Sequence, residues 1–209
     1  MDIRLSSEER KKLTDKKERI EKNKIQIIKD LDRTFVESKS FGKETEGRKQ
    51  LMNTLEVLAM KYPDIGYVQG MNFLVAAILN HSSPPVALGI MVYLMDNLKM
   101  YYIYGEGLKG VTFHNELLSK HVEMQLPELS QHLKLHEINL EIFFTQWILD
   151  LFSHIIPLSE YWSFLHNIMK HKWDFFYRLV LTMLEKMQPI LLKMDDWGNI
   201  LEEIKDYAS

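Results

Sequence analysis

Residues 62–79 read YPDIGYVQGMNFLVAAIL, and this stretch is the strongest indication of how the chain folds. Pro63 and Gly66 interrupt regular structure at its start, because proline disfavours a helical conformation in the residue before it and glycine tolerates unusual backbone angles. Beyond them, apolar residues recur at helical spacing. The residues that predict one buried helix face are Tyr67, Met71, Leu74, Val75 and Ile78.

Gln69 lies near the entrance of this predicted helix and, at about 100° per residue, roughly opposite its apolar face. Its amide can therefore stay outside the core, with an acceptor oxygen and two donor hydrogens available. Gly70 follows and leaves room for the close approach of another backbone or of a partner. Taken alone, a glutamine in this place is most often a polar helix cap, so its interpretation depends on the rest of the chain.

The same helical periodicity runs through most of the 209 residues, while the β-branched alternation typical of strands is scarce. Only 6 prolines and 9 glycines interrupt it. The sequence therefore predicts an all-α fold. The expected helices span roughly residues 24–36, 47–61, 62–80, 85–97, 112–124, 127–134, 138–153, 158–170, 173–194 and 196–207.

Two segments suggest how the chain is divided. Residues 1–23 are dense in Lys, Arg and Glu with a thin apolar stripe, which predicts a charged N-terminal helix or arm ahead of a domain spanning residues 24–209. The segment MYYIYGEGLKG carries three glycines within six residues, at Gly105, Gly107 and Gly110. It is the best candidate for a boundary, near residues 100–111, between two closely packed helical sub-lobes.

The composition limits the class of protein. Hydrophobic residues make up 46% of the chain, which is enough for a sizeable core, and the net charge of -3 provides no general attraction to nucleic acid or anionic lipid. The absence of cysteine excludes disulfides, thiolate nucleophiles and thiolate metal sites. No apolar run reaches the length of a bilayer. We therefore expect a cytoplasmic protein with no nucleic-acid partner.

Sequence motifs for a metal or a nucleotide are not persuasive. His132 and His136 are four residues apart, but no HExxH pattern surrounds them, so no metal site is expected. Neither GxxxxGK[ST] nor GxSxG occurs. The chain is therefore expected to carry no cofactor of its own.

A second polar residue of interest lies upstream, in the stretch KIQIIKDLDRTFV of residues 24–36. Its apolar residues Ile27, Ile28, Leu31 and Phe35 share one predicted helix face, and Asp30 and Arg33 project away from that face. The two charged residues are three apart and can pair on a helix. Taken alone, such a pair is usually a surface ion pair that contributes little to stability.

Together, the two stretches resemble the signature motifs of the TBC domain, the GTPase-activating domain that acts on Rab-family GTPases. The first motif, IxxDxxRT, is complete as Ile27, Asp30, Arg33 and Thr34, and the second, YxQ, as Tyr67 and Gln69. The resemblance spans about Lys24 to Leu192. The other residues that match the family are Phe41, Ala59, Tyr62, Pro63, Ile65, Gly66, Gly107, Leu108, Gly110, Leu126, Pro127, Leu129, Gln146, Trp147, Leu151, Phe152 and Pro157.

The sequence also departs from the family pattern in three places, one of which is a short segment between the helix after Pro157 and the next helix. The tryptophan-containing motif that often opens the domain is not visible before Lys24, and Leu165-His166-Asn167 replaces the usual Trp-Asp pair. These departures bear on stability and on the choice of partner more than on chemistry, because Arg33 and Gln69 of the two motifs are intact.

The resemblance implies that Arg33 and Gln69 are an arginine finger and a glutamine finger, which the domain inserts into a Rab-family small GTPase. The GTP and Mg²⁺ would belong to that partner. Asp30 is then expected to orient Arg33, and Tyr67 to fix the loop that carries Gln69, with Thr34 and Gly70 as further supporting residues.

Two alternatives remain at this stage. A TBC-like fold can dock a GTPase or scaffold without accelerating hydrolysis, or the domain can be a helical adaptor in which the motif match is accidental. In the leading interpretation, contact with a membrane is only indirect, when the GTPase recruits the domain to endomembranes.

Overall fold

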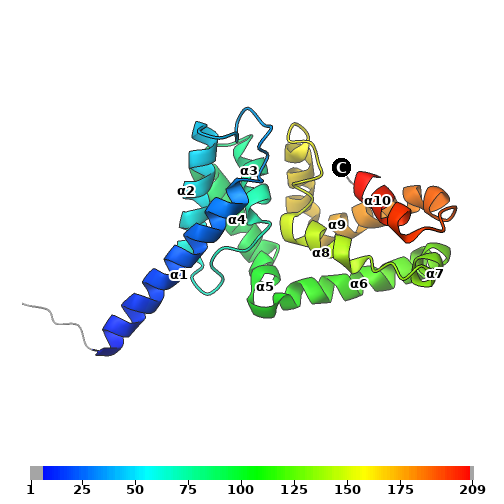
Figure 1. Cartoon of the computed structure of the whole chain (residues 1–209), viewed down its shortest axis with the longest axis horizontal. Helices are drawn as coiled ribbons and strands as arrows, with labels where there is room; N and C mark the ends of the chain where they lie inside the picture. The colour runs from blue at the N-terminus through cyan, green and yellow to red at the C-terminus, as the bar shows by residue number, and fades with distance from the viewer. Residues whose placement is uncertain (1–6, 208–209) are drawn as a thin grey trace, which may run out of the picture. The chain divides into compact units, whose positions relative to one another are not determined.

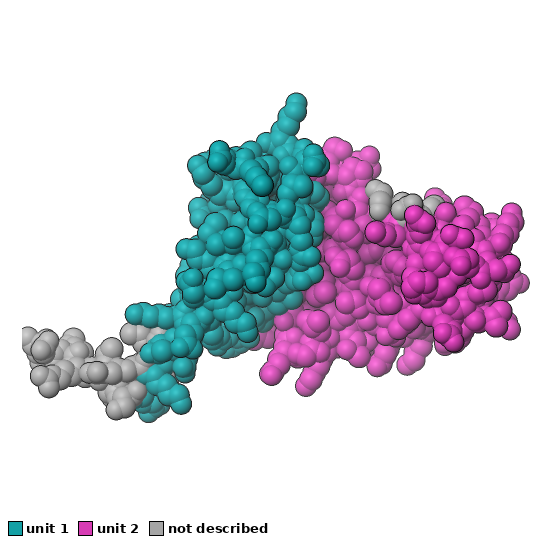
Figure 2. Space-filling model, in the orientation of Figure 1, with its two compact units in different colours: residues 1–91 teal, residues 92–209 magenta. Residues whose placement is uncertain are grey.

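The computed structural model describes residues 7–207, and every regular element in that range is a helix (Figure 1). The predicted all-α fold is therefore confirmed. The chain forms two compact units, which divide between Met91 and Val92 (Figure 2). None of the described helices is both long and apolar enough to cross a membrane.

The first unit, of which residues 7–91 are described, contains α1 (Ser7–Leu31), α2 (Glu46–Lys61), α3 (Met71–Leu79) and the first part of α4 (Pro84–Asn97). The C-terminal half of α1 packs on α2 and α3, while its N-terminal half extends past them, where residues 14–22 are exposed (Figure 1). The fully buried apolar side chains of this unit include Ile27, Leu51, Leu74, Val75 and Ile78.

Helix α1 ends at Leu31, five residues earlier than predicted, so Arg33 lies in a turn beyond the helix. Two features end it. The Asp30 carbonyl accepts from the Arg33 N–H at 3.2 Å and from the Thr34 hydroxyl at 2.6 Å, so both of its bonds are made within the terminal turn. Phe35 has a φ of 44°, which cannot continue a right-handed helix.

The prediction that Ile28 and Phe35 share a buried helix face was wrong. Ile28 is 42% exposed, and Phe35 lies outside the helix. The Phe35 ring instead makes an edge-on contact with Phe73 at 5.5 Å between ring centroids and lies 6.3 Å from Phe41.

The predicted helix over residues 62–80 is also too long. Helix α3 begins only at Met71, and residues 66–68 have no regular structure. Gly66 and Gly70 have φ values of 72° and 104°, which a helix cannot contain. Tyr67 and Gln69 therefore lie in a loop before the helix.

The second unit contains the remainder of α4 and the helices α5 (Met100–Tyr104), α6 (Lys109–Gln125), α7 (Pro127–Leu135), α8 (Glu141–Asp150), α9 (Tyr161–Leu191) and α10 (Trp197–Tyr207). Helix α6 packs against α5, α7, α8 and α9. An aromatic core supports α8 and α9, in which Trp147 stacks on Phe152 at 5.2 Å between ring centroids.

The glycine-bearing segment that was expected near the boundary lies within the second unit, where it joins α5 to α6 through a 3-10 turn at Glu106–Leu108. A side chain at Gly110 would place its Cβ 2.7 Å from the Tyr102 carbonyl oxygen. The glycine thus permits close packing of α6 on α5. The division between the units falls instead inside α4.

The spacing of Gly105, Gly107 and Gly110 also fits GxGxxG, a pattern that can mark a dinucleotide-binding turn. Such a turn follows a β-strand. Here helix α5 precedes the glycines, so the structural context of a dinucleotide site is lacking.

Helix α9 is broken at Lys172, where φ is 55° and ψ is −143°. This break matches the two separate helices that the sequence predicts over residues 158–170 and 173–194. A lysine in this conformation costs about 1–3 kcal/mol, because the region is favourable only for glycine. We therefore expect Lys172→Gly to raise the free energy of unfolding by about 1 kcal/mol.

Urea denaturation at a constant m-value measures this change. The matched control is Lys170→Gly in the regular part of the same helix, which should lower the free energy of unfolding by about 1 kcal/mol. A Lys172→Gly variant that is less stable than the parent would contradict the strained conformation.

Candidate functional site

Arg33 occupies the turn after α1, and its side chain is oriented by a buried carboxylate. Its Nε lies 3.1 Å and its terminal nitrogen 2.8 Å from Oδ1 of Asp30. The Arg33 side chain is 50% exposed, whereas that of Asp30 is 3% exposed. These two contacts use two of the five N–H donors of the guanidinium. The group is thus held in place and remains accessible to a partner.

Asp30 is the centre of a buried hydrogen-bond network. Besides Arg33, its carboxylate accepts from Gln26 Nε2 at 3.3 Å and lies 2.7 Å from the Tyr67 hydroxyl. A buried carboxylate is stable only when such partners replace water. The contact that the first motif implied between Asp30 and Arg33 is therefore present, and it is supported from two further directions.

Tyr67 connects this carboxylate to the loop that precedes α3. Its side chain is buried, and its hydroxyl lies within hydrogen-bond distance of both Asp30 Oδ2 and Asn72 Oδ1, at 2.7 and 3.0 Å. The single hydroxyl proton can be donated to either oxygen. The tyrosine thus links the two motifs through its side chain.

Asn72 joins the two loops directly, and the sequence analysis did not identify it. It is fully buried in the first turn of α3. Its Nδ2 donates to the Thr34 hydroxyl at 2.8 Å, and its Oδ1 accepts from the Gly70 N–H at 3.1 Å. An asparagine inside the otherwise apolar helix MNFLVAAIL was the available signal, because a buried amide needs partners.

Gln69 lies in a tight turn at the entrance of α3, and its side chain is exposed. The Met71 N–H donates to the Val68 carbonyl at 3.1 Å, which closes the turn around Gln69 and Gly70. Gly70 follows the glutamine with a φ of 104°, a conformation that favours glycine at the third position of a turn. Gln69 is thus presented on a short, closed turn.

The structure therefore brings the two motifs together within the first unit. Thr34 directly follows Arg33, Gly70 directly follows Gln69, and both are bound to the same Asn72 side chain. All four predicted supporting residues, Asp30, Thr34, Tyr67 and Gly70, are buried, whereas Arg33 and Gln69 are exposed. A cation and an amide are held by one buried network at the surface.

We expect Asn72→Ala to lower the free energy of unfolding by about 3 kcal/mol, because it leaves the Gly70 N–H and the Thr34 hydroxyl buried with a lost partner. Urea denaturation measures the change. Asn80→Ala, at the end of the same helix, should stay within about 0.5 kcal/mol of the parent. Equal midpoints for Asn72→Ala and the parent would show that the network does not hold the loops.

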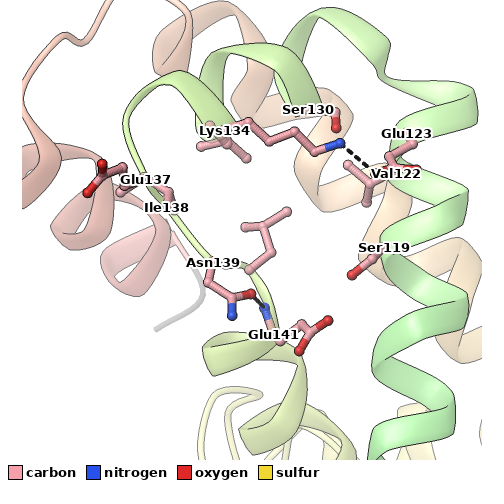
Figure 3. Close-up of a pocket in the computed structure, with 11 residues that line it drawn as sticks. Ser119, Val122, Glu123, Ser130, Lys134, Glu137, Ile138, Asn139 and Glu141 are labelled. Carbon is pink, nitrogen blue, oxygen red and sulfur yellow. Dashed lines mark hydrogen bonds and ion pairs between the residues drawn. The ribbon is translucent and has the colours of Figure 1, made fainter.

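One cavity lies elsewhere, in the second unit between α6, α7 and the start of α8, and has a volume of about 410 Å³ (Figure 3). Lys134 and Glu123 form an ion pair at its rim, at 2.6 Å. It contains none of the predicted site residues. The candidate site at Arg33 and Gln69 is instead formed by exposed side chains.

Residues 7–207 contain no group of three His, Cys, Asp or Glu side chains that could hold a metal ion. His132 and His136, the two histidines considered as metal ligands, lie against each other. The rings of His132 and His136 lie 4.5 Å apart, and His132 Nε2 is 2.9 Å from the Met194 carbonyl oxygen. His132 thus contacts the segment that precedes α10.

Comparison with known proteins shows which family the sequence matches. The family model described as "Rab-GTPase-TBC domain" matches residues 3–192. The chain is 29% identical over 181 residues to the GTPase activating protein Gyp51 of Schizosaccharomyces pombe, covering 81% of this chain and 18% of that protein. It is 26% identical over 176 residues to the Rab GTPase-activating protein tbc-11 of Caenorhabditis elegans, covering 83% and 19%.

A solved structure shares the fold. The TBC domain of a Chlamydomonas flagellar RabGAP superposes with a TM-score of 0.78 at 21% identity, over 92% of this chain and 66% of that one. This likeness concerns the arrangement of helices. The chain spans less than a fifth of the length of the two sequence relatives named above.

Proposed function

Because this chain belongs to the Rab-GTPase-TBC domain family, we propose that it accelerates GTP hydrolysis by a Rab-family small GTPase through Arg33 and Gln69. The family resemblance carried by the two sequence motifs is thereby confirmed. The observation that supports the mechanism is the shared Asn72 contact, which joins the turn after Arg33 to the turn after Gln69.

Arg33 has the properties of a group that stabilises the transition state. During hydrolysis, negative charge spreads over the γ-phosphoryl group and the leaving oxygen. A planar guanidinium can donate two parallel hydrogen bonds to such oxygens, and an arginine supplied by a second protein contributes about 10³–10⁵ in rate. Asp30 holds the guanidinium from one side, which reduces the cost of ordering it in the complex.

Gln69 would orient the attacking water. A carboxamide accepts one hydrogen bond and donates others, so it can hold a water molecule in line with the phosphorus. Most GTPases supply this amide themselves, and here the domain would supply it to its partner. The reaction then relies on positioning and electrostatics.

The GTP and Mg²⁺ are carried by the GTPase in this proposal, and the domain contributes side chains only. Contact with endomembranes would be indirect and made through the GTPase. The two named relatives are GTPase-activating proteins by name, and one of them acts on Rab GTPases.

A single-turnover hydrolysis assay tests the proposal. Each member of a panel of purified Rab-family GTPases is loaded with GTP and mixed with excess domain, and phosphate release is followed. We expect at least one member to be accelerated by about 10³-fold or more. A GTPase that binds the domain in its GTP form, with no member of the panel accelerated, would favour a binding module instead.

A further inference from the structure

One face of α1 carries a row of polar residues. In the sequence, this row spans the charged segment of residues 1–23 and the helix predicted over residues 24–36. Arg19, Asn23, Gln26 and Asp30 follow one another at intervals of four, three and four residues. This spacing places them on the same side of the helix. The row begins in the part of α1 that extends past α2 and α3, and it ends at the carboxylate that binds Arg33.

The two N-terminal residues of this row contact the loop that leads to Gln69. A terminal nitrogen of Arg19 donates to the Pro63 carbonyl. The Tyr67 N–H donates to Asn23 Oδ1 at 3.2 Å. A Cβ on Gly66 would lie 2.8 Å from the same Asn23 oxygen, so the loop backbone lies directly against this side chain.

Tyr67 is consequently attached to α1 at two points. Its backbone N–H is bound by Asn23, and its hydroxyl by Asp30, seven residues further along the helix. Gln69 is only two residues beyond. The closed turn at Gln69 is bound to Asn72 through the Gly70 N–H, and the segment before that turn is bound to α1 through Tyr67.

We propose that Asn23, assisted by Arg19, is a positioning residue that sets the location of Gln69 relative to Arg33. Helix α1 then acts on both fingers, since its end orients Arg33 and its middle holds the loop of Gln69. The inference rests on the proposed function. A displacement of about 1 Å in a catalytic group can lower a rate by about 10²-fold, so loss of one of the two attachments has a measurable effect.

Asn23 suits an experiment because it is half-buried at the edge of a cavity of about 550 Å³ and not in the core. We expect Asn23→Ala to lower the stimulated single-turnover rate by about tenfold. Asn23→Asp keeps an accepting oxygen and should retain most of the rate. The exposed neighbour Lys24 provides the control, because Lys24→Ala should change nothing.

Two forms of the GTPase separate positioning from general damage. Positioning predicts that Asn23→Ala weakens binding to the GTPase carrying GDP and aluminium fluoride, which imitates the transition state, by about tenfold. Binding to the GTPase carrying a non-hydrolysable GTP analogue should stay unchanged. Equal weakening of both complexes would overturn the inference, as would an unchanged rate.

Amide hydrogen exchange measured by NMR tests the contact without a GTPase. The Tyr67 amide should exchange at least about tenfold faster in Asn23→Ala than in the parent or in Lys24→Ala, because its acceptor is gone. Unchanged exchange at Tyr67 would refute the attachment to α1. If the parent accelerates no GTPase, the proposed function fails, and the exchange still decides whether α1 holds this segment.

Discussion

Replacing Arg33 with lysine is expected to lower the stimulated rate of GTP hydrolysis by about 10³-fold or more, while the affinity for the GTP-bound GTPase changes little. Lysine keeps the positive charge but loses the planar set of donors that contacts two oxygens at once. Because that contact matters chiefly in the transition state, the loss falls on the rate rather than on binding.

Single-turnover phosphate release and a direct binding measurement provide the two quantities. The matched control is Arg178→Lys in α9, an exposed arginine of the second unit that also pairs with an aspartate, Asp174. It should retain the parent rate. An Arg33→Lys variant that keeps more than about a tenth of the rate would exclude an arginine finger at this position.

The second large effect concerns Gln69. If the domain supplies the water-orienting amide, a GTPase whose own catalytic glutamine is replaced by alanine should still be stimulated. Gln69→Ala should abolish the stimulation of both the altered and the unaltered GTPase. The physical reason is that one correctly placed amide suffices to orient the water, and bulk solvent cannot replace it inside a closed interface.

The four combinations of domain and GTPase are compared in the same single-turnover assay. Gln131→Ala removes an exposed glutamine from α7 and serves as the control that leaves stimulation intact. One result would contradict the proposal. Stimulation that survives Gln69→Ala but disappears when the GTPase loses its glutamine would indicate a mechanism with arginine alone, and Gln69 would be a polar residue in the turn before a helix.

Local pattern was sufficient for several helices but not for α5, because no helix was predicted at Met100–Tyr104. The spacing of apolar residues predicted α2 over residues 47–61 and α7 over residues 127–134, and the structure has them at Glu46–Lys61 and Pro127–Leu135. Periodicity succeeds here because an amphipathic helix is encoded by residues three and four apart. The two motifs also sufficed to indicate the family, since their residues lie close together within each segment.

Helix ends were less predictable from pattern. Apolar spacing continues through Phe35 and begins before Met71, yet both residues lie at the edges of turns that break the helix. The causes are backbone conformations and hydrogen bonds, such as the Thr34 bond to the Asp30 carbonyl, that do not alter the apolar spacing. As a result, Arg33, which was expected on a helix, and Gln69, which was expected near a helix entrance, both lie in turns.

The sequence alone thus determined the all-α class, the family and the identity of the two candidate fingers. Only the tertiary structure decided what holds them. Asn72 and Thr34 are 38 residues apart in the chain, and Asn23 and Tyr67 are 44 apart. Such contacts depend on how α1, α3 and the intervening loop pack, and a polar residue's partner is chosen by that packing rather than by its neighbours in sequence.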